Sequence, residues 1–191
     1  MKKTALLVFG LILMYCLHAQ ELSVRQLKSG HYEADTSFVY TLPYLKGKSY
    51  LLIQAYQSKM SHKGEFALDF KMKKGTTICA ARSGVVTAMR EDSDKGGLKN
   101  EMLTEGNYII IDHGDGTAAH YWHLKKEGVL VNIGDTVIQG QAIGKSGNTG
   151  YSAFPHLHFE VVQITKGQVP TRFITRKGVR YLRPGKWYKG I

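Results

Sequence analysis

Histidine side chains occur in a short motif whose spacing suits metal or acid–base chemistry. His156 and His158 flank Leu157 at the start of an apolar stretch that continues to Val162. Alternate side chains of a β-strand share one face, so the two imidazoles point the same way, about 6.6 Å apart along the strand. They can therefore serve one reaction centre, in equal or in different roles.

A carboxylate and another histidine are candidates for the same centre. Asp69 lies between Leu68 and Phe70, and a carboxylate in such an apolar strand requires a partner. His62 precedes it by seven positions and completes a candidate pair. Two histidine nitrogens and one carboxylate can hold a zinc ion and leave the fourth position to water, as in catalytic zinc sites. We expect one Zn²⁺ per chain.

A third motif reads His120-Tyr121-Trp122-His123. Strand alternation places His123 on the face of Tyr121 and His120 on the face of Trp122. Only one of these two histidines is therefore expected to enter a site shared with His158.

Strands are the elements that must position these motifs. Gly is frequent at 21 residues, Pro is scarce at 4, and β-branched and aromatic residues recur in short bursts between turn residues. This pattern predicts an all-β fold, a compact antiparallel β-sheet or barrel-sandwich domain with long connecting loops. The segment Glu91 to Gly106 is polar and is expected to be a mobile loop. The expected strands are Tyr50–Ala55, Ala67–Lys71, Thr77–Ala80, Gly84–Arg90, Tyr108–Asp112, Thr117–Leu124, Gln141–Lys145 and Leu157–Ile164.

The ends of the chain differ from its middle. Residues 1–20 have the pattern of a signal peptide, because Lys2 and Lys3 precede an apolar run that is shorter than the roughly 20 residues of a membrane span. A lipoprotein anchored through Cys16 is the less favoured alternative, since Tyr15 is large. Residues 21–49 are an expected lead-in, 50–165 the catalytic domain, and 166–191 a basic tail packed on or trailing that domain, interpreted as a solvated edge. We expect an exported monomer, periplasmic or extracellular, without stable membrane insertion.

Charge and cysteine content add two constraints. The formal net charge of +11 is spread over many segments and favours anionic partners. Export makes an envelope polymer the expected partner, and nucleic acid is not expected. Without its signal peptide the chain keeps Cys79 alone, which lies in an apolar run and is interpreted as a core residue.

Over residues 50 to 165 the chain resembles the lysostaphin-type zinc endopeptidases of peptidoglycan. The matching stretches, in the family's order, are His62-Lys63-Gly64, Ala67-Leu68-Asp69-Phe70, Gly75-Thr76, Ala80-Ala81-Arg82-Ser83-Gly84-Val85-Val86, Tyr121-Trp122-His123-Leu124, Gly147-Asn148-Thr149-Gly150 and Pro155-His156-Leu157-His158-Phe159-Glu160.

This resemblance implies roles for five residues. His62, Asp69 and His158 are the expected zinc ligands, and His123 and His156 are the expected catalytic histidines. The implied reaction is hydrolysis of peptide cross-links or stem peptides of peptidoglycan, in which the metal polarises the scissile carbonyl and activates the attacking water. One catalytic histidine takes the water proton or stabilises the oxyanion.

Three alternatives accompany this interpretation. Many family members place the ligand Asp four residues after the first His, where this chain has Phe66, so Glu65 is the competing ligand to Asp69. A non-catalytic wall-binding or amidase-regulating module of the same fold is the second, although none of the five positions is lost. A biotinyl or lipoyl carrier is the third, from the stretch Gly134-Asp135 to Gly140-Gln141, but no modifiable Lys at a hairpin tip accompanies it.

Overall fold

The structure of this chain is a computed structural model that describes Leu27 and residues 38–58 and 61–191. The expected signal peptide, Cys16, His31 and most of the lead-in lie outside the described residues. Within the described part, no helix has the length and apolar character needed to cross a membrane.

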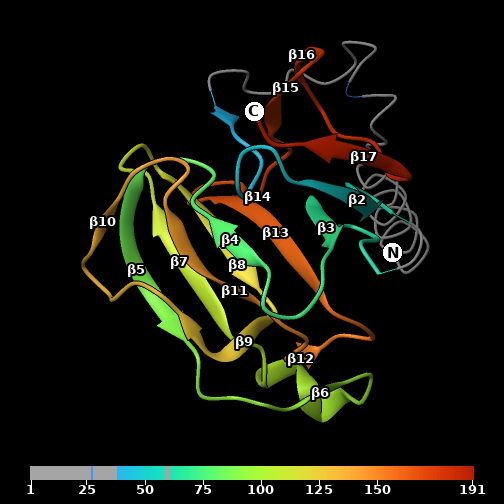
Figure 1. Cartoon of the computed structure of the whole chain (residues 1–191), viewed down its shortest axis with the longest axis vertical. Helices are drawn as coiled ribbons and strands as arrows, with labels where there is room; N and C mark the ends of the chain where they lie inside the picture. Colours follow the sequence, from blue (N-terminus) through green and yellow to red (C-terminus); the bar gives the residue numbers. More distant parts are fainter. Residues whose placement is uncertain (1–26, 28–37, 59–60) are drawn as a thin grey trace, which may run out of the picture.

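The largest sheet has nine strands, every described pairing in it is antiparallel, and it positions the histidine motifs. Its strand order is β10-β5-β7-β8-β13-β3-β2-β17, with β14 paired to β13 (Figure 1). The path ends at β10 and β17, so this sheet is open and does not close into a barrel. Its strands are β2 (Ser49–Gln54), β3 (Ala67–Lys71), β5 (Gly84–Arg90), β7 (Tyr108–Asp112), β8 (Thr117–Trp122), β10 (Thr136–Val137), β13 (His156–Gln163), β14 (Gly167–Gln168) and β17 (Lys186–Lys189).

Three smaller sheets complete the described fold, together with one short 3₁₀ helix, η1 (Asn100–Thr104). In the first, the order is β4-β11-β9; in the second, β1-β15-β16; and in the third, β6 pairs with β12. Their strands are β1 (Val39–Tyr40), β4 (Thr77–Cys79), β6 (Gly96–Gly97), β9 (Leu124–Val129), β11 (Ala142–Ser146), β12 (Gly150–Tyr151), β15 (Arg172–Thr175) and β16 (Gly178–Arg180).

Successive side chains of β13 point to opposite faces of the sheet. One face packs in the core, and the other, here called the histidine face, carries His156 and His158. Leu157 and Phe159 are buried in the hydrophobic core, as the sequence pattern predicts. The sheet β4-β11-β9 adds Ile78, Leu124 and Ile143 to the same core cluster. Burying side chains of this size stabilises the fold by about 1.5–3 kcal/mol each. The opposite face of β13 is thus left to carry polar side chains.

The all-β expectation is confirmed, and several strand boundaries agree with those predicted from the local sequence pattern. The expected strands 67–71, 84–90 and 108–112 have the bounds of β3, β5 and β7. The single strand expected over 117–124 is instead two strands, because the chain turns at His123.

The expected loop from Glu91 to Gly106 is a structured segment. It contains β6 and η1, and β6 pairs in parallel with β12. The Lys95 carbonyl accepts the Gly150 N–H at 2.9 Å, and the Gly97 carbonyl accepts the Ser152 N–H at 3.1 Å. Strands of two residues, Gly-Gly in β6 and Gly-Tyr in β12, carry no periodic apolar pattern, so the sequence does not indicate this pairing.

Candidate metal centre

Asp69 and His158 face each other across two neighbouring strands. They are register partners in the antiparallel pair of β3 and β13. His158 Nδ1 donates to Asp69 Oδ1 at 3.0 Å, and the other carboxylate oxygen lies 3.1 Å from His62 Nε2. Asp69 is 2% exposed. The fold therefore brings the three expected zinc ligands into one buried contact.

His62 reaches this carboxylate from the segment that connects β2 to β3. Its Nδ1 donates to the Ala67 carbonyl at 3.0 Å, which leaves the lone pair on Nε2. Nε2 is buried and has no hydrogen-bond partner among the described residues. A buried nitrogen with an unused lone pair beside a carboxylate suits a metal ligand.

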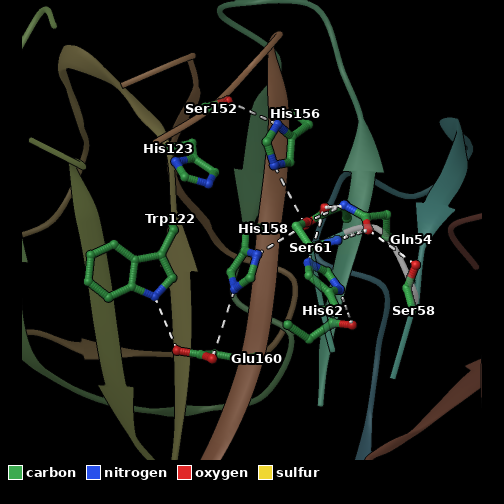
Figure 2. Close-up of polar contacts among 12 residues, drawn as sticks. Gln54, Ser58, Ser61, His62, Trp122, His123, Ser152, His156, His158 and Glu160 are labelled. Atoms are coloured by element: carbon green, nitrogen blue, oxygen red, sulfur yellow. Dashed lines mark hydrogen bonds and ion pairs between the residues drawn. The ribbon is translucent and has the colours of Figure 1, made fainter. Parts of the chain in front are cut away.

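The ring of His158 is held at both nitrogens. Its Nε2 lies 3.9 Å from Glu160 Oε2 (Figure 2). Burial opposes a charge on this ring, but the hydrogen bond to Asp69 and the nearby Glu160 carboxylate prevail and raise the pKa of His158 to about 10. A metal ligand must be deprotonated at the bonding nitrogen, so a metal ion competes with a proton here.

Glu160 is shared by several side chains on the histidine face. Its Oε1 lies 3.1 Å from His120 Nδ1 and accepts from Trp122 Nε1 at 3.3 Å, while its Oε2 accepts from Gln168 Nε2. Burial raises the pKa of this carboxyl, but His120 and His158 outweigh burial and hold the pKa well below its usual range. The carboxylate can therefore fix the orientation of His158.

His123 and His156 lie beside these three residues. The centroid of the His123 ring is 4.7 Å from that of His156 and 5.8 Å from that of His158. His156 Nε2 lies 3.6 Å from Asp69 Oδ1. Figure 2 shows both rings on the same side of His158, away from Glu160.

Backbone carbonyls fix the tautomers of these two histidines. Nδ1 of His123 donates to the Thr149 carbonyl at 2.7 Å, and Nδ1 of His156 donates to the Phe154 carbonyl at 2.8 Å. In the neutral rings the lone pair is then on Nε2. Burial and the neighbouring His156 and His158 lower the pKa of His123 to about 3, and burial also lowers the pKa of His156. Both rings are thus neutral proton acceptors near pH 7.

The predicted orientation of His123 is wrong, although its proximity to the site is right. The register pairs Trp122 with His158 and Tyr121 with Phe159, so strand alternation would send His123 towards the core with Tyr121. Instead His123 has a φ of 63°, a left-handed backbone that breaks the alternation between β8 and β9.

Tyr121 and His120 also lie on the opposite faces of the sheet from those expected: Tyr121 faces the core, and His120 faces the same side as His158. Tyr121 is a fully buried core residue whose hydroxyl accepts the Ala81 N–H, so it is not part of the site. His120 lies on the same sheet face as His158, where it contacts Glu160.

Glu65, the competing ligand, lies near two of the expected ligands. One donor atom each of His62, Glu65 and His158 falls within 4.8 Å of the others, a spacing compatible with a metal ion. Asp69 contacts both histidines directly and is almost fully buried, whereas Glu65 is half-buried. The donor set of His62, Asp69 and His158 therefore fits zinc, and Glu65 is the second choice.

Sequence reasoning missed Gln54, on β2. Its Nε2 donates to Asp69 Oδ2 at 2.7 Å and to Ser61 Oγ at 2.7 Å. Burial opposes ionisation of Asp69, but the hydrogen bond from His158 and the neighbouring His62 ring outweigh burial and hold the pKa of Asp69 well below its usual range. The signal for Gln54 was a polar residue in an apolar strand, the same kind of signal that marked Asp69.

Two further residues lie outside the site, His113 and the expected core residue Cys79. His113 Nδ1 donates to the Ser83 carbonyl at 2.8 Å at the far end of β7, and Cys79 is fully buried in β4.

Comparison with known proteins identifies the class of this chain. The model of Peptidase family M23 matches residues 61–170, more than half of the sequence. The chain belongs to this family, and the resemblance seen in the sequence is confirmed.

Several curated relatives share part of this region. Identity is 40% over 110 residues with an uncharacterized metalloprotease of Buchnera aphidicola, covering 58% of this chain and 26% of that protein. It is 39% over 94 residues with the peptidoglycan DD-endopeptidase ShyA of Vibrio cholerae, covering 49% and 19%. It is 41% over 96 residues with lysostaphin of Staphylococcus simulans, covering 50% and 17%. The chain thus spans about a quarter or less of the length of these relatives.

Solved structures agree with the fold. A zinc-containing peptidase from Vibrio cholerae has a TM-score of 0.50 and 26% identity, covering 67% of this chain and 38% of that one. The M23 metalloprotease pseudoalterin from the deep sea has a TM-score of 0.53 and 22% identity, covering 81% and 95%. The second comparison supports the fold alone.

Proposed function

We propose that this chain is a zinc-dependent endopeptidase that hydrolyses peptide cross-links or stem peptides of bacterial peptidoglycan. The observation that carries this proposal is the convergence of His62 Nε2 and His158 Nδ1 on the two oxygens of Asp69, at 3.1 and 3.0 Å. These three residues are the proposed zinc ligands. When bound there, zinc would supply Lewis-acid polarisation of the scissile carbonyl and lower the pKa of a water molecule.

His123 and His156 are the proposed catalytic residues. Each holds a proton on Nδ1 against a backbone carbonyl, and each has a lone pair on Nε2. The lowered pKa values keep both rings neutral, so either Nε2 can take the proton of the attacking water. The protonated ring can then return this proton to the leaving amine or stabilise the oxyanion.

Asp69 has a second effect on this chemistry. Its carboxylate lies 3.6 Å from His156 Nε2, and this negative charge favours the protonated form of His156. His123 has only a weaker interaction of this kind, because burial and two neighbouring histidines dominate its pKa.

Peptidoglycan is proposed as the substrate because relatives over this region bear the names peptidoglycan DD-endopeptidase and lysostaphin. A wall polymer as substrate also agrees with the expected export of the chain to the periplasm or the cell exterior.

The test is mass spectrometry of purified peptidoglycan after incubation with the zinc-loaded protein. We expect fragments with new amino and carboxyl termini within the peptides and intact glycan bonds. The control variant His158→Ala, which removes a proposed ligand, should yield none. Unchanged peptides with the zinc-loaded protein would instead support the non-catalytic module of the same fold.

A further inference from the structure

A second polar feature of the molecule is a pocket of about 390 Å³ at the C-terminal end of the chain. Its lining residues come mainly from the turn between β15 and β16, from the segment that leads into β17, and from β17 itself. No residue of the candidate metal centre lines it. The basic side chains that line it are Arg176, Lys177, Arg180, Arg183, Lys186 and Lys189.

These six cations lack compensating charge among the described residues. No Asp or Glu lines the pocket, and no ion pair within the described part of the chain joins any of the six to a carboxylate. Like charges gathered in a concave surface raise its positive potential, which attracts an anion. The pocket therefore has the electrostatics of an anion-binding site.

Local hydrogen bonds fix the two turns that carry the cations. Thr175 Oγ1 donates to the Gly178 carbonyl at 2.8 Å and accepts the Lys177 N–H at 3.2 Å. The Tyr188 hydroxyl accepts the Arg183 N–H at 2.7 Å, which ties the start of the second segment to β17. The charges are thus presented on constrained backbone, which lowers the entropic cost of binding.

An exposed indole borders the same pocket. Trp187 lines it and is 67% exposed, although Trp is a residue type that is usually well buried. A broad aromatic face with a polar edge offers a stacking surface to a ligand that is apolar on one side and polar at its rim. The flat faces of sugar rings have this character.

The sheet register connects this indole to the metal centre. Trp187 pairs with Leu51, Leu51 with Lys71, and Lys71 with His156. Register partners of antiparallel strands share a face, so Trp187 lies on the same face of the sheet as His156. Three strand spacings separate them by about 14 Å. A polymer lying across this face can contact both Trp187 and His156.

We propose that this pocket binds an acidic polysaccharide, with a sugar ring on Trp187 and its carboxylate or phosphate groups on the arginines. Guanidinium groups bind either oxyanion through paired hydrogen bonds. The choice of a glycan over other polyanions rests on the proposed function, because the shared face would bring the glycan part of a wall polymer beside the site that cuts its peptides.

The test measures binding of fluorescently labelled polymers to the full chain. Polygalacturonate supplies carboxylates and phosphomannan supplies phosphates, while neutral dextran and single-stranded DNA are the comparisons. We expect one or both acidic glycans to bind more tightly than dextran and DNA. The double variant Arg180→Glu/Arg183→Glu should weaken this binding by about tenfold or more, as expected for loss of charge-assisted hydrogen bonds.

Matched variants separate the pocket from general charge. Lys74→Glu/Lys99→Glu makes the same change in net charge at exposed positions that do not line the pocket, and should leave the affinity within about twofold. Trp187→Ala should weaken glycan binding and Trp187→Phe should restore part of it. Trp187 is exposed, so these variants test the pocket even if the double variant does not fold.

The outcomes also separate this inference from the proposed function. His158→Ala removes a proposed zinc ligand and should bind the glycan as the wild type does. Unchanged affinity in both the arginine and the tryptophan variants would overturn the proposal. Tighter binding of single-stranded DNA, or equal binding of dextran, would also refute an acidic-glycan site.

Discussion

The imidazole of His123 is fixed by the carbonyl oxygen of Thr149, which accepts its Nδ1–H at 2.7 Å. The two residues lie on separate segments, before β9 and before β12. This bond accompanies the left-handed backbone of His123, with φ 63°. A strained backbone at such a position persists only where surrounding contacts hold it. The position of His123 thus depends on the chain next to Thr149.

Gly150 provides a test of this dependence that leaves every histidine in place. Gly150 has φ 79°, and a Cβ atom there would lie 2.7 Å from Gly106 Cα and 3.5 Å from His123 Nδ1. We expect Gly150→Ala to displace the Thr149 carbonyl and lower kcat/KM by roughly tenfold or more, since small misplacements of a catalytic group are costly.

Gly134→Ala is the matched control for backbone strain. Gly134 has φ 93°, and a Cβ atom there meets nothing within 4 Å. Both variants should lose stability, by about 1 kcal/mol from the unfavourable φ alone, but only Gly150→Ala should lose activity beyond its loss of folded protein. Equal activity per folded molecule in the two variants would contradict the role of the Thr149 contact.

The proposed ligand set predicts metal content. The purified chain should hold close to one zinc, and His62→Ala, Asp69→Ala and His158→Ala should each lose it, because each removes one of three protein ligands. Glu65→Ala should keep it. Elemental analysis of the folded variants decides this. Zinc retained in Asp69→Ala and lost in Glu65→Ala would assign the carboxylate ligand to Glu65.

The two histidines beside the proposed ligands predict the opposite behaviour. His123→Ala and His156→Ala should keep zinc and fold but lower the rate by roughly 10²–10⁴, the range of general acid–base and oxyanion contributions. Cleavage of cross-linked muropeptides, measured beside the zinc content, checks this. Wild-type cleavage by either variant would remove that residue from the mechanism, and loss of zinc would make it a ligand.

The sequence predicts the features that depend on neighbouring residues in the chain, and it does not predict those that depend on contacts between distant residues. Strand β3 and the position of Asp69 follow from an apolar run with one polar residue, and the alternation His156-Leu157-His158 survives because β13 is a regular strand. The turn at His123 was not predictable in this way. Its φ is coupled to Thr149, distant in the sequence, and strand periodicity carries no information on such a contact.

The C-terminal strands are a second case in which the sequence pattern, here a run of basic residues, did not predict the structure. A basic tail without apolar alternation predicts a solvated edge but no strand pairing, and β17 pairs with β2 as an exposed edge strand of the main sheet. The pairing uses backbone groups of Lys186 to Lys189, so side-chain pattern does not reveal it. The basic residues of the tail gather into a pocket only because the β15–β16 turn folds beside β17.

The buried titratable groups predict how the stability of the zinc-free protein depends on pH. The folded state keeps the pKa of His123 near 3, whereas an unfolded His titrates near about 6.5. Between these pH values His123 is protonated in the unfolded chain and neutral in the folded chain, so the free energy of unfolding falls as pH decreases from about 6.5 towards 3. The lowered pKa values of Asp69 and Glu160 act in the same direction below about pH 4, where unfolded carboxylates protonate.

His158 accounts for a loss of stability of the zinc-free protein at alkaline pH. Its pKa is raised to about 10, so its contribution is complete below about pH 6.5 and is lost as pH rises through 10. With a chelator present, Tm should therefore peak near neutral pH. His123→Gln should flatten the acid limb between about pH 6.5 and 4, by an amount on the order of a few kcal/mol, and His158→Gln should flatten the alkaline limb. Calorimetry across this range measures both, and an acid limb identical in His123→Gln and wild type would show that the fold does not hold His123 in its neutral form.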